Sequence, residues 1–253
     1  MKEETSTTKP QYPVLKNAPI VEALLDIQVQ LPESKTLDDL HTIFDKIKEQ
    51  FPLEKKRYRF SSSIEFKEEE REAKSSIANT LVDGFLFYSE NKNKVCQSRL
   101  DGFTFNKHKP YENWPSLLKE AQVLWGFYKK VAEPIAIKRI ALRYINKIPL
   151  KMPFTPSNYF TTLPFLAHGL DYEISNLFSQ ISITNNNIGA LANITEGVEI
   201  DGSDTAQFLF DIDVIKQGDF KEQDIWKHFE DLRDFKNEIF FKSLTETTLK
   251  LLA

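Results

Sequence analysis

Cysteine, glycine and long apolar runs are scarce in this sequence, and each shortage excludes a class of protein. The single cysteine, Cys96, excludes an internal disulfide and a cysteine-based zinc site. Eight glycines in 253 residues leave little room for a glycine-rich phosphate-binding loop. No run approaches the roughly 20 apolar residues of a membrane helix, and the polar N-terminus lacks the apolar stretch of a signal peptide. We therefore expect a cytoplasmic protein that does not cross a membrane.

Catalytic signatures are missing as well. The sequence contains neither the His-Glu-x-x-His motif of zinc proteases nor the Gly-x-Ser-x-Gly motif of serine hydrolases. The four histidines are scattered, and an isolated histidine is more often a surface residue than a catalytic base. The sequence therefore gives no catalytic residue, no metal site and no cofactor.

The charge balance bears on the kind of partner. The chain has 33 basic and 37 acidic residues, a net charge of −4, so the whole protein is not expected to attract nucleic acid or anionic lipid. A local basic patch remains compatible with an anionic ligand. We expect a small molecule or a protein as the partner, and the oligomeric state stays open.

The most informative stretch is Ile137–Ile148, which has the sequence IKRIALRYINKI. Side chains alternate between the two faces of a strand, so Arg139, Arg143 and Lys147 share one face and apolar residues share the other. A row of cations on a strand needs a partner, either inside the fold or outside it. These three residues are candidate ligand-binding residues.

The rest of the chain alternates between predicted strands and helices. Alternation predicts a strand over 20–31, and a period of three to four residues predicts helices over 37–51, 113–131 and 223–251. Residues 95–105 are expected to form one strand, bent near Asp101 and Gly102. Residues 1–17 are expected to form a flexible tail before a single domain over 18–253.

The order of these elements suggests an internal duplication. Both halves, about 18–133 and 134–253, begin with a strand, contain three more strands and close with a helix. Ile20 and Ile137 are 117 positions apart, and Trp114 and Trp226 are 112 apart. We therefore expect an α+β fold built as a degenerate duplication of a strand-helix-three strands-helix unit. Its sheet would be mainly antiparallel with helices on one side. Two unrelated α+β arrangements remain the alternative.

The duplication would give the arginines acidic counterparts. An offset of 117 takes Arg139 to Glu22 and Arg143 to Asp26. If the two leading strands pair antiparallel, Glu22 would lie near Arg143 and Asp26 near Arg139, forming structural ion pairs.

A second acidic pair gives the arginines another set of possible partners. Asp211 and Asp213 lie at alternate positions of FLFDIDVI, so they share one face of a strand. They could neutralise the arginines, or they could act in acid–base chemistry or as metal ligands. Lys147 corresponds to Gln30, and it is the cation most available to a ligand.

The segment 107–114, KHKPYENW, joins a strand to a helix and is rich in aromatic and basic residues. Tyr111 and Trp114 could stack on a base or help to hold a phosphate at the helix N-terminus. Alternatively, the two rings could anchor the helix to the sheet, because aromatic side chains contribute most when buried.

Three motifs together resemble a known family: NAPIVEALLDI at 17–27, RLDGFTFNKHKPYENW at 99–114 and IKRIALRYINKI at 137–148. FLFDID at 208–213 and FFKSLTE at 240–246 fit it too. The chain resembles a sporadically distributed, uncharacterised family of bacterial and archaeal proteins of about this length. The resemblance implies one full-length domain, adds no catalytic residues, and suggests a link to mobile or defence genes.

Two functions are compatible with these observations. The first is a non-enzymatic protein that binds a ligand or partner on a concave sheet surface. The alternative is an enzyme acting on a phosphorylated or nucleic-acid substrate, with the arginines holding anions and Asp211 or Asp213 in acid–base or metal chemistry. Carboxylates within about 4–6 Å of the arginines, with no cavity beside them, would favour binding. An open pocket lined by unpaired arginines would favour the enzyme.

Overall fold

The computed structural model describes residues 12–65, 74–162, 176–200 and 204–253, and these form one nine-stranded antiparallel sheet with helices. The strands lie in the order β2-β3-β4-β5-β1-β6-β9-β8-β7. They are β1 (Ile20–Gln30), β2 (Leu53–Glu65), β3 (Lys74–Tyr88), β4 (Lys94–Arg99), β5 (Gly102–His108), β6 (Ala136–Lys151), β7 (Phe178–Asn185), β8 (Ala190–Ile200) and β9 (Thr205–Phe220). The predicted α+β class and mainly antiparallel sheet are confirmed.

β1 and β6 pair antiparallel in the middle of the sheet, with Leu25 opposite Leu142 and Asp26 opposite Ala141. The chain then extends the sheet in both directions. β5 to β2 continue it beyond β1, and β9 to β7 continue it beyond β6. The sheet therefore divides at the β1–β6 pair into a part from the first half of the chain and a part from the second.

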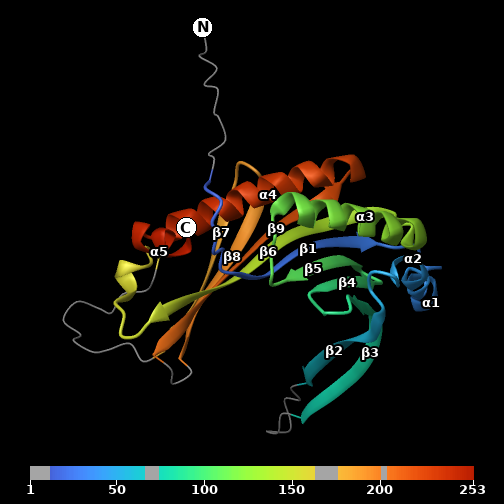
Figure 1. Ribbon diagram of the computed structural model, residues 1–253. Helices are drawn as coiled ribbons and strands as arrows, with labels where there is room; N and C mark the ends of the chain where they lie inside the picture. The colour runs from blue at the N-terminus through green and yellow to red at the C-terminus, as the bar shows by residue number, and fades with distance from the viewer. Residues whose placement is uncertain (1–11, 66–73, 163–175, 201–203) are drawn as a thin grey trace.

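The helices lie on one face of this sheet (Figure 1). They are α1 (Leu37–His41), α2 (Phe44–Ile47), α3 (Trp114–Ala132), α4 (Glu222–Ser243) and α5 (Glu246–Leu252), with a 3₁₀ turn, η1, at Pro156–Asn158. At one end of the sheet β2 and β3 run away from α3 and α4, whereas β7 at the other end passes beside α4 (Figure 1). Of the described helices, none is both long and apolar enough to cross a membrane.

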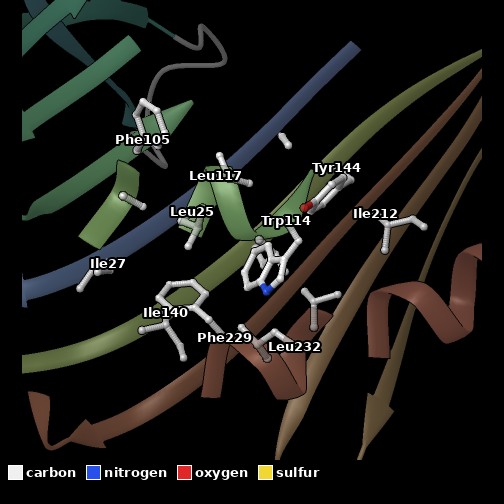
Figure 2. Packing of buried hydrophobic residues seen from close by; sticks show 14 of the residues in the cluster. Leu25, Ile27, Phe105, Trp114, Leu117, Ile140, Tyr144, Ile212, Phe229 and Leu232 are labelled. Atoms are coloured by element: carbon white, nitrogen blue, oxygen red, sulfur yellow. The ribbon is translucent and has the colours of Figure 1, made fainter. Parts of the chain in front are cut away.

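The core fills the space between the helices and the sheet. Alternate residues of β1, including Leu25 and Ile27, are fully buried, and they pack with rings and aliphatic side chains of α3 and α4 (Figure 2). Trp114 of α3 donates from Nε1 to Glu230 Oε1 of α4 at 2.7 Å. The apolar stripes read from the sequence therefore form one core beneath both long helices.

Local chemistry sets the helix ends. The Asn113 side chain accepts a bond from Ser116 N at 2.9 Å and so caps α3, which ends where Glu133 takes a left-handed conformation (φ 48°). The single helix predicted over 223–251 is in fact two helices. Leu244 is extended, and the Thr245 side chain caps α5 by accepting from Thr248 N.

Two further predictions need correction. The strand expected over 95–105 is a hairpin, β4 and β5, because the chain reverses at Leu100 and Asp101 rather than bending. The first half therefore has four strands after its first helix instead of three. The helix predicted over 37–51 is two short helices separated at Thr42 and Ile43.

The described part of the expected tail contacts the C-terminal helices. Tyr12 stacks on Phe241 of α4 with ring centroids 4.8 Å apart, and Asn17 N donates to Leu252 O at 3.1 Å. Residues 1–11 of the expected tail lie outside the described residues.

The two faces of β1 give a direct test of this architecture. Leu25→Ala should cost about 2–5 kcal/mol of unfolding free energy, because its side chain is fully buried under the helices. Leu24→Ala is the matched control on the opposite face of β1, where the side chain is half-buried, and it should cost less than half as much. Urea denaturation followed by circular dichroism measures both, and equal costs would contradict the assignment of faces.

Candidate binding face of the sheet

The face of the sheet without described helices is called the open face here. Strand register and ion pairs together place ten charged residues in one row across it, called the charged row. From β2 to β9 its members are Arg57, Arg59, Asp83, Asp101, Arg99, Asp26, Arg139, Asp213, Arg143 and Asp211.

Asp26 lies at the centre of the row. Its carboxylate accepts from Arg99 Nη2 at 2.8 Å, from Thr104 Oγ1 at 2.7 Å and from Arg139 Nη1 at 2.9 Å. Only 12% of the Asp26 side chain and 7% of the Arg99 side chain are exposed. Burial acts to lower the pKa of Arg99, but Asp26 and Asp101 outweigh it and the net shift is upward. Asp26 therefore joins four strands, β4, β5, β1 and β6, through one buried carboxylate.

Arg143 pairs with an acid of the neighbouring strand. Its guanidinium makes a two-pronged contact with Asp211, with Nε 2.9 Å from Oδ1. The hydrogen bond to Asp211 raises the pKa of Arg143. Glu22, the acid expected beside Arg143, instead accepts from Asn106 Nδ2 at 2.6 Å and lies 3.4 Å from His108. Strand order explains the difference, because β6 has β9 as well as β1 as a neighbour.

Lys147 also has a partner, although it is the cation that the sequence leaves most available to a ligand. Its Nζ lies 2.7 Å from Glu199 Oε2 of β8. Both side chains are exposed at more than a third of their surface, so this pair is a weak one.

Asp213 differs from its neighbours. It lies opposite Arg143 in the register, yet no hydrogen bond joins its carboxyl to another residue in the part of the chain that the structure describes. Burial raises the pKa of Asp213; Asp211 and Asp26 add to this effect, while Arg139 and Arg143 oppose it. The fold therefore disfavours the charged form of this half-buried carboxyl.

The row continues into β2 and β3, where the sequence analysis named no site residue. Asp83 of β3 contacts Arg57 and also lies 2.9 Å from Arg59 Nε, both on β2. Arg59 reaches on to Asp101, which binds Arg99 at 2.8 Å. Arg57 and Arg59 occupy alternate positions, which indicates that they share one face of a strand. Their partners depend on the order of the strands in the sheet.

Tyr111 and Trp114 lie on the other face of the sheet, away from the arginines. The Tyr111 hydroxyl is 2.8 Å from the buried Tyr144 hydroxyl, and Trp114 is bonded to Glu230 of α4. Tyr111 therefore connects the segment before α3 to the sheet, and Trp114 connects α3 to α4. Beside them, Lys236 is buried with Nζ 4.0 Å from the centre of the Tyr144 ring, and burial lowers its pKa to about 7.

Two surface hollows lie elsewhere. One, of about 620 Å³, is beside β7 and α4, and the other, of about 650 Å³, lies near Phe51 and Asn91. Neither is lined by an arginine of the charged row. The described residues also contain no group of three or more histidine, cysteine or acidic side chains able to hold a metal ion.

Comparison with known proteins gives no further assignment. No family model matches the chain, and no curated protein matches it.

The two acids of β9 should respond in opposite ways to neutralisation. The pKa of Asp213 is raised above its ordinary value of 3.8, so its contribution to stability is present below that value and is lost as pH rises through the folded-state pKa. Asp213→Asn should therefore raise unfolding free energy at pH 7, with a gain that shrinks toward pH 3.8. Urea denaturation at a series of pH values measures it.

Asp211→Asn is the matched control, two residues earlier on the same face. It removes the partner of Arg143 and should cost about 1–3 kcal/mol at pH 7. If Asp213→Asn destabilised the protein as much as Asp211→Asn does, Asp213 would be a structural ion-pair partner.

Proposed function

We propose that this is a non-enzymatic binding protein that holds a partner on the open face of its sheet. One observation carries the proposal: each arginine of the charged row is bonded to a carboxylate, and the face is left without a helix among the described residues. A carboxylate beside each arginine neutralises its charge, so the row attracts a further anion less strongly than free arginines would. A face with balanced charges remains suited to recognition of a partner.

The composition of the face favours a protein partner. Arg59 and Arg143 keep 53% and 42% of their side chains exposed, so they retain donors that can face outward. Half-exposed aliphatic side chains surround the row, namely Leu24, Ile145, Leu209 and Ile215. Arginine mixed with apolar area is typical of protein interfaces. The alternating acids cancel the positive field that a nucleic-acid interface requires.

We infer that the two halves, 18–133 and 134–253, are a degenerate duplication. In each half the leading strand, β1 or β6, lies next to the last strand, β5 or β9, and each half closes with a long helix on the same face. The two leading strands pair antiparallel in the centre. Each half would then supply one part of the open face.

Site-specific photo-crosslinking tests the proposed face. A photoreactive phenylalanine at Ile145, on the open face, should give a covalent partner adduct in cells of the source organism. Val123 on α3 is the matched control, because it is 53% exposed and lies on the helix side. Adducts from the control position alone would refute the proposal.

Arg143→Gln separates binding from the enzymatic alternative, in which Arg143 clamps a phosphorylated or nucleic-acid substrate with help from Asp211 or Asp213. The proposal expects no binding of a mixed-sequence oligonucleotide or of inorganic phosphate by the wild type, measured by titration calorimetry. Salt-sensitive binding that the folded variant loses would support the alternative and contradict the proposal.

A further inference from the structure

The two edges of the sheet differ sharply in charge. β2 forms one edge, and five of its first seven residues are charged: Glu54, Lys55, Lys56, Arg57 and Arg59. β7 forms the other edge with the sequence FSQISITN, which contains no charged residue and no proline. Charged side chains and proline are the usual means by which an edge strand avoids pairing with another chain. β2 is protected in this way and β7 is not.

β7 also presents its backbone outward. Six of its eight residues are exposed, and among the described residues only β8 pairs with it. Val198 N bonds to Leu177 O at 3.1 Å, so odd-numbered residues point their backbone groups toward β8. The free N–H and C=O groups at the outer edge therefore belong to Phe178, Gln180, Ser182 and Thr184.

A hollow with a partly apolar lining accompanies this edge on the helix side. It has a volume of about 620 Å³, and its apolar lining comes from β7, β8 and α4: Ile181, Ile183, Ile194, Phe235 and Ile239. Ile181 and Ile183 are 45% and 38% exposed, so no described residue forms a wall on the outer side of the hollow. A tenth strand beside β7 would place alternate side chains at this opening.

We propose that the occupant is the β7 strand of a second copy of this chain, paired antiparallel across a twofold axis at Ser182. In this register Ser182 exchanges backbone bonds with the partner's Ser182, and Gln180 does so with the partner's Thr184. Ile181 of each copy then lies opposite Ile183 of the other copy. These two pairs flank the axis, on the helix side of the sheet. The two copies close each other's hollow with apolar side chains.

Charge decides between self-pairing and the other possible arrangement. Pairing β7 with β2 of the next copy would build an open filament, but it would place uncharged β7 against five charged side chains. Pairing β7 with β7 buries no charge from either strand. It also closes after two copies, because the twofold contact uses the same surface on each.

Solution mass tests the proposal. Analytical ultracentrifugation of the full chain should give twice the 29.4 kDa mass of one chain at micromolar concentration. Ile181→Lys places a cation at the twofold contact and should raise the dimer dissociation constant at least about tenfold. Val123→Lys, on the exposed surface of α3, is the matched control and should leave the dimer intact.

Substitutions at Ser182 identify the strand in contact. Ser182→Pro removes an outward N–H together with the Ser182 hydroxyl that donates to Asn193 Oδ1 at 2.7 Å. Neither is a backbone bond to β8, so the variant should abolish the dimer while circular dichroism stays unchanged. Ser182→Cys should form an intermolecular disulfide on oxidation, whereas Val123→Cys should not, and the native Cys96 is buried. A monomer, larger assemblies, or a dimer that withstands Ser182→Pro and gives no Ser182→Cys disulfide would each overturn the proposal.

Discussion

The register between β1 and β6 is the constraint on which the rest of the molecule depends. These strands lie in the middle of the sheet, and their side chains alternate between an apolar face under the helices and a charged face. A slip of one residue would turn Arg139 and Arg143 into the core and turn the apolar residues outward. Asp26 acts against such a slip, because only the observed register lets it bind Arg99 and Arg139 together. The charged row therefore specifies the pairing more than it adds stability, as expected for buried ion pairs.

A second constraint follows from the one-sided arrangement of the helices. A sheet covered on one face leaves its other face to water, and that face must be polar enough to remain soluble. The protein meets this need with alternating acids and bases that neutralise one another across seven strands. Asp213 departs from the pattern, because its charge is disfavoured where it lies. A hydrogen bond donated to the ionised carboxyl would offset part of the cost of its burial.

Sequence patterns predicted the faces well and the partners poorly. Alternation identified the two faces of β1 and β6, and the Asn113 cap with helical spacing located α3. Breaks in elements were harder to predict, because residues 95–105 read as a continuous strand while Asp101 turns the chain back on itself. Only part of the charged row could be predicted from the sequence. The pairing of Arg57 and Arg59 with Asp83 and Asp101 depends on which strands become neighbours. Tyr111 and Trp114 remained ambiguous because an aromatic residue serves an anchor and a ligand site equally well.

The open face and the β7 edge are linked by symmetry. A twofold axis perpendicular to the sheet at Ser182 keeps each face on its own side, so the open faces of two copies would point the same way. The helices of both copies would cover the opposite side of one continuous sheet. Such a dimer would present both charged rows on the same face of the joined sheet. A partner with two linked or symmetric epitopes could then engage both, and its apparent affinity would exceed that of either face alone.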